Sequence, residues 1–416
     1  MRDQRLHTPE GVRDIYGEEL LRKEKLEETI LQNIHTFGYR DIETPTFEYF
    51  DIFSKEIGTT PSRELYKFFD KEGDTLVLRP DFTPSVARCV VKYFSETTSP
   101  VRLCYKGNVF SNTSSLQGKL KEGTQIGAEL MGVSSQDGSR DEYEQQLLTQ
   151  DAEMIALVVK TLLACGLQDF QVSIGEVNFF SSLCQEACLD EGTKERLREL
   201  IHNKNLFGAE ELLNSLNNVP DYALQDLLAV LGYTGGEDVL ECASKVHSKR
   251  AQEAVGYLSR LLDLLKAYGV DRYVSFDLSM ISKYNYYTGI ILKAYTYGVG
   301  DAIVKGGRYD KLLSFFGKDI PAVGFVTVLD DVLTALQSQG IGIPVQQENI
   351  LYVYEVSDYE EALKELDNLR KEGAFVTALP VGDAGHFNKD AALSQGFYHR
   401  LFIKGKGESA QEVMIG

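Results

Sequence analysis

The chain has 416 residues, of which 43% are hydrophobic and 25% charged, as is typical of a globular protein of two or three domains. Its formal net charge of −19 disfavours nucleic-acid binding, which needs a basic face, and favours small-molecule chemistry or protein partners. The N-terminus has no apolar run, and the most apolar helical stretch, residues 152–167, is interrupted by Lys160 and too short to span a bilayer. We therefore expect a cytoplasmic protein without membrane contact.

Cysteines and histidines do not predict a metal site. Cys184 and Cys188 lie four residues apart and would share a helix face, but no second cysteine pair or close histidine completes a ligand set. The six histidines show no metal-binding spacing. We expect buried thiols in a reducing compartment, no metal and no cofactor.

The first third of the chain alternates helical and strand-like runs. Helical periodicity over 17–36 ends at Gly38, and an extended run interrupted by Pro45 follows. KFFD and DTLVLRPD predict strands joined by a KEGD turn, and DFTPSVARCVVKYF predicts a helix with Pro84 in its first turn. VRLCYKGNVF and GTQIGAELMG predict two strands around a Ser/Thr/Gly-rich loop.

The middle of the chain is helical and then returns to strands. Residues 141–166 predict a helix and QVSIGEV a strand, and the stretch of about 178–269 reads as an all-helical insertion. RYVSFDLSM, TGIILKAYTY and DAIVKGGRYD predict strands, and PAVGFVTVLDDVLTAL ends as a helix. Strands joined mostly by hairpins, with helices outside, predict an α+β domain on an antiparallel sheet over residues 1–340.

A glycine- and glutamine-rich segment, residues 341–347, predicts a linker. The tail, 348–416, contains ILYVYEV, a helical run and FVTALPV, and this order predicts a small α/β domain. Twelve Asp/Glu against seven Lys/Arg give the tail a net charge of 7 − 12 = −5, which is the wrong sign for RNA binding.

Six segments together resemble histidine–tRNA ligase, a class II aminoacyl-tRNA synthetase. They are FGYRDIETPTFE (37–48), LRPDFTPSVAR (78–88), the hairpin 109–132, YYTGI (286–290), KGGRYDKL (305–312) and AVGFVTVLDDVL (322–333). They occur in the ligase order, and the resemblance that they carry extends over most of residues 8–335. The resemblance implies a class II synthetase-like antiparallel sheet flanked by helices, with a helical insertion and a small α/β C-terminal domain.

The sequence departs from the ligases where phosphate would bind. The resemblance implies three arginines: after the hairpin phenylalanine, four positions before the paired tyrosines, and on the last helix after a glutamate. Ser111, Ser282 and Asp331 stand at these positions. Because arginine binds phosphate oxygens in a bidentate fork and never loses its proton, losing all three argues against adenylate formation. Lys119 and Lys121 supply only point charges.

The amino-acid side of the resemblance is better preserved. The matching residues, which imply a histidine-shaped pocket, are Asp81, Thr83, Gln125, Glu129, Tyr286 and Tyr287. In the ligases an acid and a threonine receive the amino group, and the others face the carboxylate and imidazole. Here the acid is shortened from glutamate to Asp81, and Asn285 replaces an expected aspartate.

Each residue also has an ordinary structural interpretation. Asp81 would cap the following helix, and Glu129 would pair with Arg88 or Arg308. The two tyrosines would lie in a plain strand, and Gly306–Gly307 would form a turn.

RPDFTPSVAR, NYYTGIILKAY and GVGDAIVKGGRYDKLL resemble the regulatory subunits of ATP phosphoribosyltransferase more than they resemble the ligases. That family implies a non-catalytic subunit, homodimeric or larger, that joins a short catalytic subunit in the first step of histidine biosynthesis. It also implies L-histidine as an effector, no tRNA, and a C-terminal remnant of the anticodon-binding domain. Two alternatives remain open: a divergent histidine–tRNA ligase, and a synthetase-like binding module with another partner.

Overall fold

The computed structural model describes residues 6–53, 60–94, 96–113, 120–134, 139–216, 219–280, 287–345, 349–390 and 398–413. Two compact units divide the chain: Met1–Asp14 with Lys23–Gly342, and Ile15–Arg22 with Ile343–Gly416. The boundary at 342/343 falls within the segment that the sequence predicts as a linker. Among the described residues, no helix combines the length and apolar character needed to cross a membrane.

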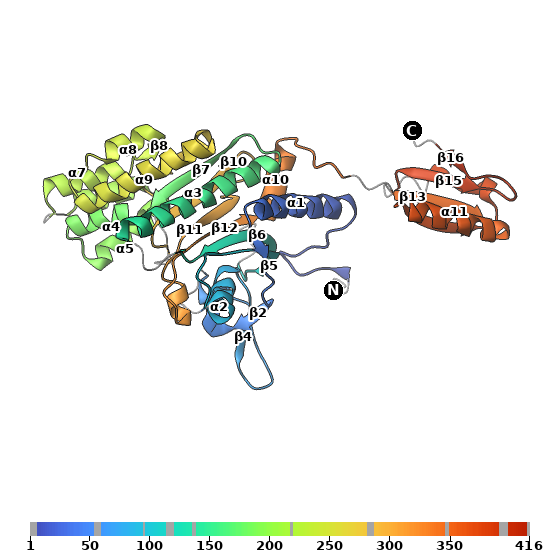
Figure 1. Ribbon diagram of the computed structural model, residues 1–416, viewed down its shortest axis with the longest axis horizontal. Helices are drawn as coiled ribbons and strands as arrows, with labels where there is room; N and C mark the ends of the chain where they lie inside the picture. Colours follow the sequence, from blue (N-terminus) through green and yellow to red (C-terminus); the bar gives the residue numbers. More distant parts are fainter. Residues whose placement is uncertain are drawn as a thin grey trace. The chain divides into compact units, whose positions relative to one another are not determined.

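A large mixed sheet forms the centre of the first unit (Figure 1). In spatial order its described strands are β1 (Arg40–Asp41), β5 (Val101–Phe110), β6 (Glu122–Met131), β12 (Ala322–Val328), β11 (Val304–Arg308), β10 (Ile290–Thr296), β7 (Phe170–Glu176), β9 (Val274–Asp277) and β8 (Thr234–Gly235). Most neighbours are antiparallel, but β1 pairs with β5 and β7 with β9 in parallel. The sheet is therefore mixed at both ends, and antiparallel between β5 and β7 as predicted.

A smaller three-stranded sheet precedes α2 (Thr83–Tyr93). Its strands are β2 (Phe47–Tyr49), β4 (Thr75–Leu78) and β3 (Lys67–Phe69). The α2 helix starts as the sequence predicts, with Pro84 in its first turn, and buries Val86, Ala87 and Val90 in the core. The residues just before α2 and those in its first turn therefore lie against one face of the large sheet.

The other face of the large sheet carries helices. α3 (Arg140–Ala164) packs on β11 and β12, and α10 (Leu329–Ser338) packs on β6. α1 (Gly17–Thr36) reaches α3 through a hydrogen bond of 2.8 Å from Asn33 Nδ2 to Thr161 Oγ1. A capping box at Ser139 and Glu142 satisfies the first turn of α3.

Helices fill nearly all of the segment between β7 and β9 (Figure 1). They are α4 (Val177–Glu186), α5 (Glu191–His202), α6 (Leu206–Asn214), α7 (Asp221–Val230), α8 (Glu237–Ala243) and α9 (Lys249–Tyr268). α9 ends at Gly269, whose φ of 70° is the left-handed conformation that glycine adopts at little cost. This helix packs against α3 and α4 and so joins the helical segment to the layer behind the sheet.

The second unit contains a four-stranded sheet and α11 (Tyr359–Lys371). Its strand order is β14 (Phe375–Val381), β13 (Asn349–Glu355), β15 (Arg400–Lys404) and β16 (Gln411–Val413). β13 is parallel to both β14 and β15, and the α11 connection between β13 and β14 is the predicted β-α-β unit. The predicted α/β character of the tail is confirmed.

Candidate functional site: a carboxylate pocket on the sheet

Three strands form the floor of the candidate pocket. In the register of the sheet, Glu129 on β6 lies beside Gly324 on β12, which lies beside Gly307 on β11. A Cβ atom at Gly324 would overlap Glu129 Oε2, and one at Gly307 would lie 2.8 Å from the Tyr287 ring. The glycines therefore leave room for the Glu129 carboxylate and for the Tyr287 ring above the sheet. Gly306 and Gly307 belong to β11, so the turn interpretation is wrong.

Glu129 is the centre of this pocket, and only 1% of it is exposed. Its carboxylate accepts hydrogen bonds from Thr83 Oγ1 at 2.8 Å, from Tyr105 OH at 3.2 Å, and from Tyr309 OH. Burial raises the pKa of Glu129 to about 7, although the three hydroxyl donors oppose this shift by stabilising the charged form. A group with such a pKa accepts or releases a proton near neutral pH.

An aromatic stack positions Tyr105. The Phe82 ring stacks on the Tyr105 ring at 4.4 Å, and the Arg79 guanidinium lies over the Phe82 ring, 4.1 Å from its centre. A side chain at Gly127 would collide with the Tyr105 hydroxyl. This glycine therefore keeps the Tyr105 hydroxyl within reach of Glu129.

The remaining predicted residues lie around this centre. Burial raises the pKa of Tyr287, and the nearby charges of Glu129 and Asp81 raise it further, which places the three groups together. Asp81 does not cap α2, whose N-cap is Phe82 without a side-chain cap bond. Gln125 lies four residues before Glu129 on the same face of β6, and its buried Oε1 has no hydrogen-bond partner among the described residues. Tyr286 lies outside the described residues.

The structural alternative for Glu129 is wrong. Arg88 Nη2 donates to Glu48 at 2.7 Å, and Arg308 Nη2 donates to Asp151 at 2.6 Å. Neither arginine reaches Glu129, whose partners named above are all hydroxyl groups. The pocket therefore offers a carboxylate, hydroxyls and aromatic walls, a set that suits a cationic or N–H-bearing heterocycle such as imidazole.

Sequence reasoning missed Tyr105 and Tyr309. Tyr309 lies in the KGGRYD motif, two residues after Gly307, so strand alternation puts it on the pocket face. Tyr105 pairs with Gly127 across β5 and β6, and only the strand register reveals this pairing.

The positions where the resemblance implies phosphate-binding arginines carry no arginine in this chain. The Ser111 N–H donates to the Lys121 carbonyl at 2.9 Å, and Asp331 lies in the first turn of α10, next to Asp330. Asp330 Oδ2 accepts from the Thr124 N–H at 2.9 Å. Ser282 lies outside the described residues. The described lost-arginine positions thus present a serine and a carboxylate.

Arg79 does not replace the missing cations. Its guanidinium donates to three backbone carbonyls, those of Thr44 at 2.8 Å, Asn108 at 2.8 Å and Pro45 at 3.3 Å. It is 7% exposed. These hydrogen bonds therefore occupy the guanidinium and hold the chain segments around α2 in place.

His35, Asp41 and Cys104 form a group of potential metal ligands, the one such group among the described residues. The three already contact one another: His35 Nε2 lies 3.0 Å from Asp41 Oδ1, and Cys104 Sγ donates to the same oxygen at 3.5 Å. Burial, with the neighbouring Asp41 charge, raises the pKa of the Cys104 thiol to about 12. The thiolate that metals prefer is scarce near neutral pH, so the absence of a metal stays our prediction.

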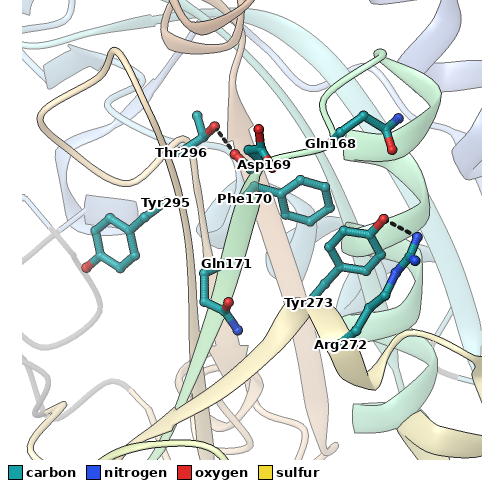
Figure 2. A pocket seen from close by; sticks show the side chains of 8 residues that line it. All are labelled: Gln168, Asp169, Phe170, Gln171, Arg272, Tyr273, Tyr295 and Thr296. Carbon is teal, nitrogen blue, oxygen red and sulfur yellow. Dashed lines mark hydrogen bonds between the residues drawn. The ribbon is translucent and has the colours of Figure 1, made fainter. Parts of the chain in front are cut away.

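An open cavity of about 720 Å³ lies where β7 begins (Figure 2). Its lining residues are Gln168, Asp169, Phe170, Gln171, Arg272, Tyr273, Tyr295 and Thr296. The Phe170 and Tyr273 rings stack at 4.7 Å, and Arg272 Nη2 donates to the Tyr273 hydroxyl at 2.6 Å (Figure 2). None of the predicted site residues lines this cavity, so it is separate from the Glu129 pocket.

Comparison with known proteins defines the class of this fold. The family model described as histidyl-tRNA synthetase matches residues 11–332. A histidyl-tRNA synthetase from Nostoc sp. PCC 7120 superposes with a TM-score of 0.76 over 98% of this chain and 96% of that one; at 21% identity, this shows the fold alone. The fold is therefore that of a histidyl-type class II synthetase, as predicted.

Closer relatives narrow the assignment. An ATP phosphoribosyltransferase regulatory subunit from Acetivibrio thermocellus is 36% identical over 377 residues, which are 90% of this chain and 87% of the relative. A structure titled as an ATP phosphoribosyltransferase regulatory subunit/histidyl-tRNA synthetase, from Bacillus halodurans, is 30% identical, with a TM-score of 0.84 over 97% of this chain and 99% of that one. This chain belongs to the family of ATP phosphoribosyltransferase regulatory subunits.

Proposed function

We propose that this chain is a non-catalytic subunit that a short ATP phosphoribosyltransferase catalytic subunit requires for the first step of histidine biosynthesis. L-Histidine acts through this chain as the feedback inhibitor. The observation that supports the proposal is a contrast: Glu129 is buried and accepts hydrogen bonds from Thr83, Tyr105 and Tyr309, while Ser111 and Asp331 occupy positions where the resemblance implies arginine. Such a site holds an amino acid and does not activate it.

The loss of aminoacylation follows from electrostatics. Forming an adenylate requires cations that neutralise a triphosphate and the charge developing at the α-phosphate. Near β6 the described structure places Asp330 and Asp331 in the first turn of α10, and Arg79 is occupied by carbonyl groups. The side chain of Lys23 donates to Thr124 Oγ1 on β6 at 2.6 Å and supplies a point charge without the arginine fork. A carboxylate at an arginine position repels the phosphate that the arginine would attract.

The pocket supports histidine as the effector. The imidazole N–H donates to Glu129, and Tyr287, Tyr105 and Tyr309 surround the ring, while Asp81 and Thr83 receive the ammonium group. Binding there favours one conformation of the complex over another, and this coupling lowers catalytic activity. Homodimerisation within the hetero-oligomer and a cytoplasmic location belong to the same proposal.

The domain roles are part of the proposal as well. Residues 1–340 act as the synthetase-like domain with a helical insertion at about 178–269, 341–347 as the linker, and 348–416 as a shortened anticodon-domain remnant. Cations of the tail support the last assignment, because Lys404, Arg400 and Lys371 are each paired with carboxylates. Three of the seven cations of the tail are therefore occupied, and its net charge of −5 opposes binding to the RNA backbone.

Reconstitution tests the proposal. Phosphoribosyl-ATP formation from ATP and phosphoribosyl pyrophosphate is measured for a short catalytic subunit alone, with this chain, and with this chain plus histidine. We expect activity to appear only with this chain and to fall when histidine is added. No effect of this chain on a cognate catalytic subunit would contradict the proposal and favour a binding module with another partner.

A divergent ligase is the second candidate, favoured by the double title of the Bacillus halodurans structure. It predicts histidine-dependent exchange of pyrophosphate into ATP. We expect no exchange above a protein-free blank, and exchange at a rate that requires this chain would replace our proposal with the ligase.

A further inference from the structure

Two lysines face each other on the pocket side of the large sheet. Lys293 on β10 and Lys305 on β11 are direct register partners. Lys305 lies two residues before Gly307, so strand alternation puts it on the same face, about 7 Å along the strand. Because the Tyr287 ring covers Gly307, the lysine pair borders the Glu129 pocket.

The position of this pair is unusual for lysines that serve only solubility. Lysines often guard the exposed edge of a sheet against pairing with another chain. β10 and β11 are interior strands, with β12 on one side and β7 on the other. Like charges directly opposite each other in a sheet are destabilising, so this arrangement needs a compensating anion.

Neighbouring carboxylates compensate only part of this charge. Lys305 Nζ lies 3.0 Å from Asp301 Oδ2, and Lys204 Nζ lies 3.4 Å from Asp277 Oδ2. Lys293 has no hydrogen bond or ion pair among the described residues. Burial lowers the pKa of Lys293, as do Lys305 and Lys204, while Asp301 and Asp277 oppose the shift. Lys293, Lys305 and Lys204 thus lie close to two carboxylates, those of Asp301 and Asp277, in a chain whose formal net charge is −19.

The surroundings of the pair fit a small anion. Ser173 on β7 is the other register partner of Lys293 and supplies a hydroxyl on the same face. Gln171 and Tyr295, which Figure 2 labels, form the next pair along β7 and β10. The face therefore continues from the Glu129 pocket, through the lysines, to polar side chains that donate hydrogen bonds.

We propose that Lys293 and Lys305 form an oxyanion site beside the Glu129 pocket. The oxyanion is either the carboxylate of an amino acid held in the pocket, which rests on the proposed function, or a free phosphate, which does not. Each lysine contributes a point charge and N–H donors to either group. This site lies on β10 and β11, away from the positions of Ser111 and Asp331 on the hairpin and on α10.

Calorimetric titration of the full chain tests the site with three probes: L-histidine, L-histidinol, in which an alcohol replaces the carboxylate, and inorganic phosphate. The variants are Lys293→Met and Lys305→Met, which keep the length of the side chain and remove its charge. Lys318→Met is the control, since Lys318 is exposed and outside both sites.

If the oxyanion is the carboxylate, Lys293→Met weakens L-histidine binding about tenfold, the usual effect of a lost charge-assisted hydrogen bond, and leaves L-histidinol binding unchanged. If it is phosphate, the same variant weakens phosphate binding by a similar factor. Lys305→Met weakens binding of the same probe as Lys293→Met does. Lys318→Met binds all probes as the wild type does. Without ligand, Lys293→Met should melt no lower than the wild type, because it removes a like-charge contact.

Two results would overturn the site: lysine variants that bind histidine and phosphate like the wild type, or a wild type that binds neither. These titrations need no catalytic subunit. A failure of activation in the reconstitution assay would thus reject the proposed function while leaving the phosphate result intact.

Discussion

At the scale of single residues, the proton on Glu129 is the most informative feature. The folded-state pKa of about 7 lies above the ordinary value of 4.5 because burial penalises the charged carboxylate. The folded chain therefore binds a proton between these pH values that the unfolded chain has released. Stability contributed by this group is fully present below pH 4.5 and is lost as the pH rises through 7.

Glu129→Gln should remove this pH dependence. Between pH 5 and pH 8, the free energy of unfolding of the wild type should fall relative to the variant by about 1–3 kcal/mol. Urea unfolding at both pH values measures the difference. Glu176, whose pKa burial also raises to about 7, is present in both proteins, so its contribution cancels.

Glu72→Gln is the control for this experiment, because Glu72 is exposed in the β3–β4 turn. Its free energy of unfolding should equal that of the wild type at both pH values. If the free energy of unfolding of Glu129→Gln changes with pH as that of the wild type does, the Glu129 carboxylate is ionised at both pH values. Burial then does not raise its pKa.

Gly324→Ala should close the pocket. The new Cβ would overlap Glu129 Oε2 and lie 2.8 Å from the Ala128 carbonyl oxygen. We expect a loss of about 1–3 kcal/mol of stability, the usual range for overpacking, together with the loss of histidine binding. Thermal unfolding and calorimetric titration measure the two effects.

The matched control is Gly256→Ala within α9, where an added Cβ meets nothing within 4 Å. There the same substitution should stabilise the chain by about 0.5–1 kcal/mol, because alanine is the better helix former. If both substitutions changed the stability equally, Glu129 would have moved to relieve the overlap at Gly324.

At the scale of elements, one ion pair joins three of them. Arg308 on β11 donates from Nε at 2.9 Å and from Nη2 at 2.6 Å to Asp151 on α3, and Tyr257 on α9 donates to the other oxygen of Asp151 at 2.6 Å. Both charged side chains are almost fully buried, with exposed fractions of 4% and 1%. The helical layer is thereby fixed to the strand that carries Gly307 and that Tyr309 directly follows.

Asp151→Asn should therefore destabilise the chain by about 3–5 kcal/mol, because it leaves the Arg308 charge buried beside a neutral amide. Asp310, 3.1 Å from Arg308 Nη1, compensates in part and favours the lower end of this range. Chemical unfolding measures the loss. Arg140→Gln, which breaks an exposed pair on the same helix, should change stability by less than about 1 kcal/mol. If Asp151→Asn lost as little stability as Arg140→Gln, the buried ion pair would not have the stabilising role described here.

Elements with a clear period were predictable from the sequence. The helix expected over 17–36 is α1, and the strands expected around the Ser/Thr/Gly-rich loop are β5 and β6. β1 and β8, of two residues each, carry no such period, and their pairing depends on distant strands. The parallel pairs at the two ends of the sheet follow from that pairing, and so they were not predicted.

The sequence predicted residues that the structure brings together, but it did not predict their contacts. Resemblance singled out Thr83 and Glu129, which form a hydrogen bond of 2.8 Å. The roles of Tyr105 and Tyr309 required the register of β5, β6 and β11. The Lys293–Lys305 pair is invisible in the sequence because twelve positions separate the two residues, and only the β10–β11 pairing brings them together.

At the scale of the whole molecule, the two units differ in what they do with charge. The first unit keeps a buried, ionisable carboxylate in a pocket. In the second, Lys404 is 1% exposed and surrounded by Glu361 at 3.2 Å, Glu365 at 3.4 Å and Asp358 at 3.8 Å. That cation holds β15 to α11 and is unavailable to RNA, which agrees with our proposal that the tail is a remnant of an anticodon-binding domain.

The central claim is that histidine regulates the catalytic subunit through the Glu129 pocket. The most direct measurement is the histidine inhibition curve of phosphoribosyl-ATP formation, with the catalytic subunit reconstituted with wild-type chain, Glu129→Gln or Glu72→Gln. We predict that Glu129→Gln still activates the catalytic subunit but needs at least about tenfold more histidine for half inhibition, the effect of one lost charge-assisted hydrogen bond. Glu72→Gln should superimpose on the wild type. An unchanged curve for Glu129→Gln, with activation intact, would contradict the claim and remove this pocket from the regulation.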